Sequence, residues 1–120
     1  MKVAVSSQGR DISSPVDERF ARAPFFVIVD TESGEAHAVD NAQNMNAAQG
    51  AGVQAAATVV AQDVEAVITV HCGPKAFRAM RAAEIKIYCG AEGTVADAIT
   101  KLKSGDLQEA DDADVEGHWV

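Results

Sequence analysis

The chain has 120 residues and a formal charge of −8, from 18 acidic and 10 basic side chains. Its length indicates one domain, and its hydrophobic fraction of 48% excludes a wholly disordered chain. The acidic balance argues against nucleic acid as a partner, because Lys and Arg must neutralise phosphates. Six acidic residues and no basic ones fall in residues 106–120, so residues 1–105 carry a net charge of only −2. We predict one domain over residues 1–105 and a mobile acidic tail over 106–120.

No targeting or membrane segment is evident. The chain lacks the run of about 18 apolar residues that a membrane helix needs, and its N-terminus has no signal-peptide pattern. We expect a cytoplasmic protein. Its two cysteines, Cys72 and Cys89, are too few for a disulfide scaffold and are expected to be reduced.

The first 40 residues predict three strands. Val3–Ser6 is a short apolar run, and Pro24–Thr31 is rich in aromatic and β-branched residues. A turn at residues 32–35 leads to a third strand over Glu35–Asp40. Because this connection is too short for a parallel crossover, the last two strands should form an antiparallel hairpin.

The rest of the chain alternates between helices and strands. Alanine-rich, capped or amphipathic segments predict helices over Ala47–Gln62 with Asn46 as N-cap, Lys75–Ala83 after Pro74, and Val95–Lys103 between Thr94 and Gly105. The strands predicted between them are Glu65–Val70 and Ile85–Tyr88. This alternation predicts parallel strands with helices packed on the sheet. The fold class is therefore α/β, a three-layer sandwich with a five-stranded mixed sheet.

Glycine is concentrated where the three helices begin, in segments 46–52, 71–75 and 89–94. A helix N-terminus has unpaired N–H groups and a positive dipole end, and glycine lets a ligand approach the backbone. In an open α/β sheet these ends share one edge, where ligands bind. Three such ends would hold an anion. For any single junction, tight turns and close packing explain the glycines equally well.

A Cys/His group accompanies these junctions. Cys72 and Cys89 each follow a strand, and His71 is adjacent, a combination that suits soft metals. Three ligands fall short of the four in a closed zinc site. Cys89 is more typical of a small buried residue, whereas Cys72 opens a helix, where a thiolate is stabilised. A thiol redox function is a further possibility, against which the absence of a CxxC motif counts.

Segment 10–24 carries Arg10, Arg19 and Arg22 with three acidic residues. It is either a solvated loop with local ion pairs or a source of positive charge for a bound anion. The sequence has no nucleophile elbow, no HExxH and no recognisable Ser/His/Asp arrangement. We therefore expect a binding protein and not an enzyme.

Four ordered motifs resemble the dinitrogenase iron–molybdenum cofactor-binding family. Residues 14–26, SPVDERFARAPFF, look like the family's SPV-x-E-x-F-x-RAP-x-F segment. The other three are QGAGVQAA at residues 49–56, GPKAF at 73–77 and GAEGTV at 90–95. The resemblance extends to about Gly105. It implies a ribonuclease H-like α/β fold with strand order 3-2-1-4-5.

Two departures from the family pattern refine this resemblance. Arg19 replaces a histidine that many members have, and His71-Cys72 replaces their Asn-Val. The His-Cys-Gly-Pro version is similar to the orange-protein branch found in anaerobic sulfate reducers. That similarity implies a molybdenum–copper sulfide cluster held non-covalently, with the iron–molybdenum cofactor as the alternative. It also implies small ATPases of the cell-division positioning type as partners.

The leading hypothesis is a non-enzymatic carrier of an anionic metal–sulfide cluster, and the main alternative is an interaction module that regulates such an ATPase. His71 and Cys72 are candidates to lie near copper. The full set of candidate cluster-binding residues is Arg19, Arg22, Gln49, Gly50, Ala51, Gly52, His71, Cys72, Gly73, Pro74, Gly90, Gly93 and Thr94.

Overall fold

A computed structural model describes residues 1–44 and 50–111. Its five strands form one sheet in the order β3-β2-β1-β4-β5. β1 and β3 pair antiparallel with β2, while β4 pairs parallel with β1 and β5. The mixed sheet and its strand order are confirmed. The strands are β1 (Lys2–Ser7), β2 (Phe25–Asp30), β3 (Ala36–Asp40), β4 (Ala66–Ile68) and β5 (Lys86–Tyr88).

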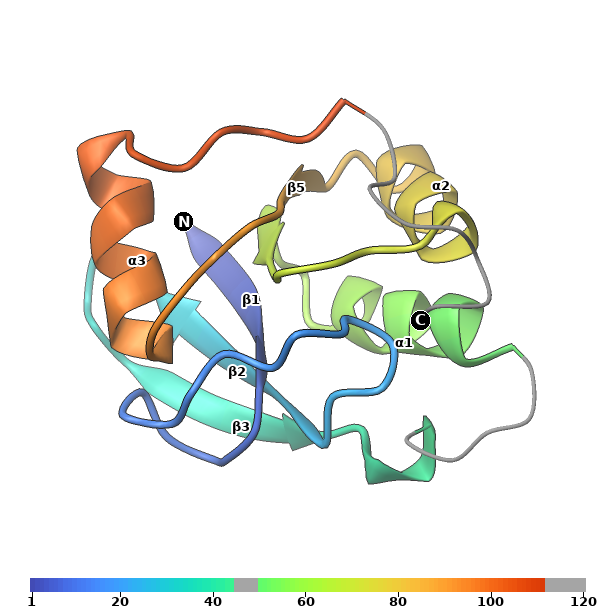
Figure 1. Cartoon of the computed structure of the whole chain (residues 1–120), viewed down its shortest axis with the longest axis horizontal. Helices are drawn as coiled ribbons and strands as arrows, with labels where there is room; N and C mark the ends of the chain where they lie inside the picture. Colours follow the sequence, from blue (N-terminus) through green and yellow to red (C-terminus); the bar gives the residue numbers. More distant parts are fainter. Residues whose placement is uncertain (45–49, 112–120) are drawn as a thin grey trace.

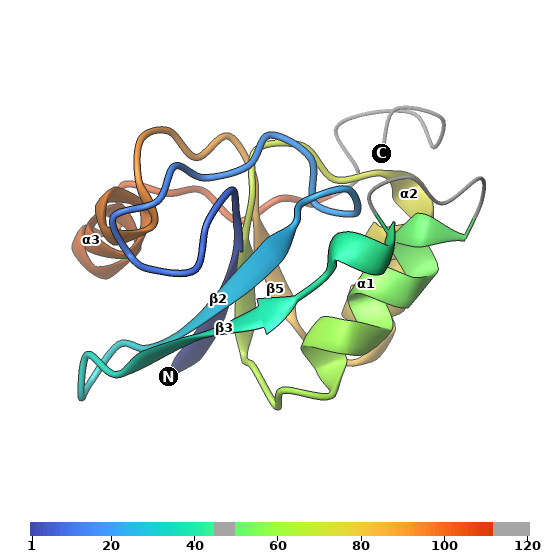
Figure 2. The same cartoon turned by 90° about the horizontal axis from the view of Figure 1, so that it is seen from below.

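The three helices divide between the two faces of the sheet. Helices α1 (Ala51–Val60) and α2 (Pro74–Ala82) cover one face, and α3 (Val95–Ser104) lies on the other (Figures 1 and 2). Successive residues of β1 point to opposite faces, so Ala4 joins one hydrophobic cluster while Val3 and Val5 join the other. This confirms the three-layer prediction. None of the described helices is long and apolar enough to cross a membrane.

The first helix begins later than predicted. It starts at Ala51, four residues after the expected start, behind Gly50 with φ at 80°. A residue in this left-handed conformation cannot continue a right-handed helix, so Gly50 marks the start. The predicted N-cap, Asn46, lies outside the described residues. A short 3₁₀ helix, η1 (Ala42–Asn44), follows β3 and was not predicted.

The beginning of the predicted tail is part of the folded domain. Leu107 and Ala110 pack against the two hydrophobic clusters. The amide of Ala110 donates to the carbonyl of Ile87 over 2.8 Å, and Glu109 forms an isolated antiparallel β-bridge with Tyr88. In Figure 1 this segment runs from α3 past β5 toward α2. It covers the open edge of β5, so the boundary predicted at residue 105 is too early.

Helix α3 has the N-terminus predicted for it. The Thr94 hydroxyl accepts from the Asp97 amide over 3.1 Å, and the Asp97 carboxylate accepts from the Thr94 amide over 3.0 Å. This reciprocal pair is a capping box. The hydrogen bonds from the Thr94 backbone and side chain hold the pKa of Asp97 below its ordinary value. Gly93, with φ at 83°, leads the chain into the cap.

Replacing Gly93 with alanine should therefore destabilise the fold by about 2–3 kcal/mol. The left-handed conformation costs roughly 1–2 kcal/mol for a residue with a side chain, and loss of a cap costs about 1 kcal/mol more. A Cβ at this position would lie 2.5 Å from the Asp97 Oδ2. Gly90→Ala is the matched control, because Gly90 shares the positive φ but has open space around it. Urea denaturation should show the larger loss for Gly93→Ala, and equal losses would contradict the cap's role.

Candidate functional site

A long loop between β1 and β2, residues 8–24, lies across the carboxyl edge of the sheet. Figure 2 shows this β1–β2 loop, the segment after β4 and the segment before α3 along the same edge, at the top. The buried Ser6 hydroxyl donates to the Asp17 carbonyl over 2.9 Å and accepts from the Thr69 hydroxyl over 2.8 Å. The amide of Val16 donates to the carbonyl of Gly93 over 3.0 Å. The loop is therefore tied to β1 and to the segment before α3 at residues 16 and 17, and the solvated-loop interpretation holds only for residues 8–15, which are mostly exposed.

The same loop runs beside the His71 segment. The amide of His71 donates to the carbonyl of Glu18 over 2.9 Å, and the amide of Phe20 donates to the carbonyl of His71 over 3.1 Å. Phe20 is fully buried, with its ring centroid 5.0 Å from that of Phe26. Arg19 is exposed and His71 partly exposed. Phe20 thus anchors the loop in the core and places Arg19 alongside His71.

Arg22 links the loop to the segment that leads toward α1. Its side chain is half-buried, and its Nη1 donates to the carbonyl of Asn44 in η1 over 3.2 Å. A guanidinium is always charged at neutral pH, so Arg22 brings a positive charge to this part of the loop. The two arginines predicted from sequence therefore lie on one stretch of the loop, with Arg19 beside His71 and Arg22 beside η1.

The N-termini of α1 and α2 are packed against each other. Both helices have glycine as N-cap, Gly50 for α1 and Gly73 for α2, and glycine has no side chain to accept from the helix amides. A Cβ added at Gly52 would lie 3.4 Å from the Cβ of Ala76 and 3.5 Å from its backbone nitrogen. Gly52 thus lets the first turns of the two helices meet. This arrangement places two positive dipole ends side by side.

Helix α3 does not offer its N-terminus in this way. The amides of Val95 and Ala96 donate to the carbonyls of Ser14 and Ile12, over 2.9 and 2.8 Å, and the third amide belongs to the capping box. The first two amides of α3 thus donate to carbonyls of the β1–β2 loop and not to a ligand. The prediction that all three helix N-termini share an anion is therefore wrong for α3. Gly90 and Gly93 have φ near 80°, as a turn before a cap requires. The candidate edge narrows to α1, α2 and the β1–β2 loop.

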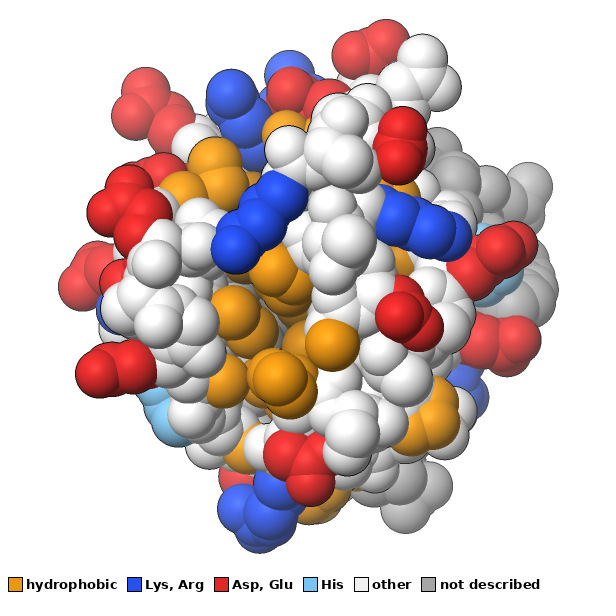
Figure 3. Space-filling view, turned by 90° about the vertical axis from the view of Figure 1, so that its left-hand side faces the viewer, with side chains coloured by type: hydrophobic (Ala, Val, Ile, Leu, Met, Phe, Trp, Pro, Cys, Tyr) orange, Lys and Arg blue, Asp and Glu red, His pale blue; other side chains and the backbone are white. Residues whose placement is uncertain are grey.

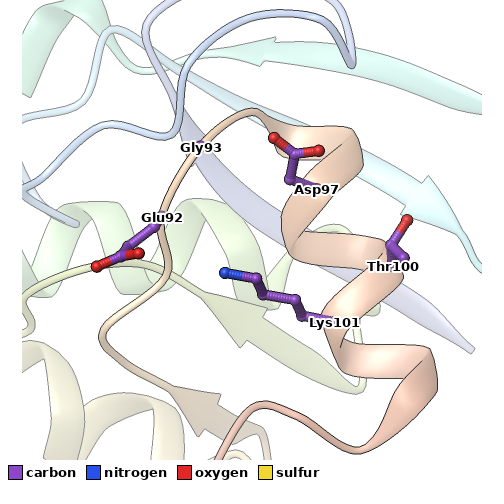
Figure 4. Close-up of a pocket in the computed structure, with 5 residues that line it drawn as sticks. All are labelled: Glu92, Gly93, Asp97, Thr100 and Lys101. Carbon is purple, nitrogen blue, oxygen red and sulfur yellow. The ribbon is translucent and has the colours of Figure 1, made fainter.

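A shallow pocket of about 390 Å³ lies against the first turns of α3 (Figure 4). Glu92, Gly93, Asp97, Thr100 and Lys101 line it. The Lys101 amine extends toward Glu92, while Asp97 turns back to the cap. Two carboxylates against one ammonium give the pocket a negative balance. On the wider face around α3, hydrophobic side chains gather near the centre, and acidic and basic side chains are scattered around them (Figure 3). Neither feature suits an anion.

The two cysteines are buried in the reverse order to that expected. Cys72 is 0% exposed and belongs to the core beneath α1 and α2, with its Sγ 3.7 Å from the Gly73 carbonyl oxygen. Cys89 is partly exposed. The Cys72 side chain is packed in the core just before α2 begins. Its place at the helix N-terminus therefore does not make the thiol accessible to solvent. Within residues 1–44 and 50–111, no group of three His, Cys, Asp or Glu side chains could hold a metal ion.

Thiol labelling should distinguish the two cysteines. In the native protein, iodoacetamide should modify Cys89 and leave Cys72 unmodified, because only accessible thiols react. In denaturant both should react. Mass spectrometry of the labelled peptides measures this, and Cys89→Ser should remove the native labelling. Faster native labelling of Cys72 than of Cys89 would contradict the burial described above.

Some residues that shape the edge were not singled out from sequence. Ser6 and Thr69 are buried polar residues near the ends of two apolar strands; Ser6 hydrogen-bonds the loop at Asp17, and Thr69 hydrogen-bonds Ser6. Their signal was a hydroxyl interrupting each apolar run. Asn41 and Asn44 are also fully buried, and their sequence gave no such signal. Among the candidates, Gln49 lies outside the described residues, and Pro74 is the first residue of α2.

Comparison with known protein families supplies the decisive observation. The family model described as dinitrogenase iron-molybdenum cofactor matches residues 1–105. The chain belongs to this family. The match confirms the resemblance drawn from the four motifs. A search of curated proteins gave no match.

Solved structures agree with this assignment. The apo form of the orange protein from Desulfovibrio gigas is 35% identical, with 95% of this chain and 96% of that chain covered and a TM-score of 0.92. A Thermotoga protein described as a NifB protein of the DUF35 family is 40% identical, with 97% and 98% covered and a TM-score of 0.83. A Methanocaldococcus jannaschii protein described as a dinitrogenase shares the fold, at 19% identity, 93% and 96% coverage and a TM-score of 0.71.

Proposed function

We propose that this chain is a non-enzymatic carrier that binds an anionic metal–sulfide cluster non-covalently at the edge formed by α1, α2 and the β1–β2 loop. The observation that carries the proposal is the contact between two glycine-capped helix N-termini beside a loop bearing Arg19 and Arg22. This edge gathers positive dipole ends and guanidinium groups in a chain whose overall charge is −8.

The chemistry of such a cluster matches these groups. Sulfide spreads negative charge over large, soft atoms, which backbone N–H groups at helix N-termini and arginine side chains stabilise by charge and hydrogen bonding. A cluster that brings its own sulfide ligands has its metals already coordinated. The protein then supplies shape and positive potential, as a carrier that must later release its cargo requires.

The identity of the cluster rests on the family resemblance. The orange-protein branch implies a molybdenum–copper sulfide cluster, and His71-Cys72-Gly73-Pro74 is the motif that carries this similarity. The iron–molybdenum cofactor is the alternative within the same family. Arg19 stands where many members have a histidine ligand, which favours charge over coordination at that position. The comparisons give no support to an ATPase partner.

We assign different roles to the two residues expected near copper. The His71 side chain is partly exposed beside Arg19, whereas the Cys72 thiol is buried. His71 is therefore the residue proposed to lie beside the copper, whose ligands remain the sulfides of the cluster. Cys72 is proposed to pack beneath the site and set the path of the chain into α2.

Reconstitution tests the proposal. Apo-protein is mixed anaerobically with tetrathiomolybdate and copper(II), passed over a desalting column and analysed for metals and visible absorption. Molybdenum and copper should elute with the protein at a fixed ratio, with an absorption band that neither reagent shows alone. Metals and colour that elute wholly with the small molecules would refute the proposal. The same mixture with urea-denatured protein controls for thiol capture by the unfolded chain.

A further inference from the structure

Two buried asparagines, Asn41 and Asn44, hydrogen-bond the part of the β1–β2 loop that carries Arg22. Asn41 lies just after β3 and is 0% exposed. Its Nδ2 donates to the carbonyl of Ala21 over 3.0 Å and to that of Ala23 over 2.8 Å. Its backbone amide donates to the Pro24 carbonyl over 2.8 Å. One side chain therefore holds the backbone carbonyls of the two residues that flank Arg22.

Asn44 completes the arrangement from η1. Because the Asn41 Nδ2 is engaged by two carbonyls, its Oδ1 must accept, and it accepts from the Nδ2 of Asn44 over 2.7 Å. The backbone carbonyl of Asn44 in turn accepts from the Arg22 Nη1 over 3.2 Å. These hydrogen bonds form a closed network. It runs from the backbone carbonyls that flank Arg22 through the two asparagines to the Arg22 guanidinium.

One atom of this network is left unsatisfied. The Oδ1 of Asn44 is buried and has no hydrogen-bond partner among the described residues. An unsatisfied buried oxygen is destabilising, and an apolar side chain would avoid the loss. Burial therefore does not explain an asparagine at this position, whereas the bond that its amide makes to Asn41 does.

We propose that Asn41 and Asn44 are positioning residues that hold the Arg22 guanidinium toward the bound anion. The inference rests on the proposed function, since the anion is the metal–sulfide cluster of that site. A guanidinium held in place by a rigid backbone loses less conformational entropy on binding than one on a free loop. The network thus acts on cluster retention through Arg22 and not by touching the cluster.

A double-mutant cycle with a salt titration tests the proposal. Binding of the tetrathiomolybdate–copper complex is measured for the wild type, Asn41→Ala, Arg22→Gln and the double variant, each below its melting transition. Asn41→Ala should weaken binding about tenfold, the lower end of the effect of outer-shell partners at metal sites. The double variant should bind no more weakly than Arg22→Gln, because both changes remove the same interaction. Asn41→Ala should also show the shallower salt dependence of Arg22→Gln.

A merely structural role gives a different pattern. If the fold-losses in cluster affinity of the two single variants multiply in the double variant, and Asn41→Ala keeps the wild-type salt dependence, the positioning role is overturned while the proposed function stands. If the wild-type protein itself retains no cluster, both fall. Should Asn41→Ala not fold, Asn44→Ala decides in the same terms. It removes the amide that supports Asn41 but keeps the backbone carbonyl that accepts from Arg22.

Discussion

Replacing Arg22 with glutamine is expected to weaken retention of the reconstituted cluster by about tenfold or more. A hydrogen bond to a charged group contributes roughly 1.5–3 kcal/mol, and 1.4 kcal/mol corresponds to a factor of ten. The half-buried setting of Arg22 keeps its charge from being fully screened. Glutamine removes the charge and most of the donors and keeps a polar amide on a shorter side chain. The measurement is equilibrium binding of the complex at several salt concentrations.

The salt series separates an electrostatic contact from a packing defect. Wild-type affinity should fall as salt increases, and the affinity of Arg22→Gln should fall less steeply. Lys103→Gln is the matched control, because it removes one positive charge from an exposed position in the last turn of α3, away from the proposed edge. Equal effects of the two substitutions would show that only net charge matters and would remove Arg22 from the site.

Replacing Phe20 with alanine is expected to destabilise the fold by about 3–5 kcal/mol, the usual loss for a buried phenylalanine. Phe20 is fully buried and packs on Phe26, and it is the apolar anchor of the β1–β2 loop. The same substitution should also abolish cluster retention, because the hydrogen bonds to His71 on either side of Arg19 depend on that anchor. Guanidinium denaturation gives the stability, and retention is then measured on protein that remains folded.

Phe25→Ala serves as the comparison. Phe25 is partly exposed, with the Arg10 guanidinium 4.6 Å from its ring centroid, so its loss of stability should be roughly half that of Phe20→Ala or less. Should Phe20→Ala lose less than Phe25→Ala, the loop would not be anchored as described. A folded Phe20→Ala variant that retains the cluster as well as the wild type does would show that the cluster site does not depend on the anchored loop.

The elements that sequence predicted best are those with local signals. The hairpin of β2 and β3, the Thr94 cap and the end of α3 at Gly105 all follow from residues within a few positions of each other. The strand order followed from the family resemblance, because pairing between distant strands leaves no local trace. The start of α1 was misplaced because a glycine with positive φ and an ordinary helical glycine read alike in sequence.

The site was predicted in outline and not in detail. The motifs predicted that Arg19, Arg22 and His71 belong to one site, and the structure shows backbone contacts that place Arg19 beside His71. Long-range hydrogen bonds decided the rest. The β1–β2 loop occupies the amides of α3, which no spacing rule predicts, and burial of Cys72 depends on how α1 and α2 pack above it. The roles of Asn41 and Asn44 likewise depend on contacts about 20 residues apart in sequence.

Metal analysis of the protein purified anaerobically from the organism that makes it tests the central claim most directly. The account predicts molybdenum and copper in a fixed ratio to protein, an absorption band in the visible range, and a decrease of both when Arg22 is replaced. Molybdenum with iron in place of copper would keep the carrier function and change its cargo. Protein that is colourless and free of both molybdenum and sulfide under these conditions would contradict the account.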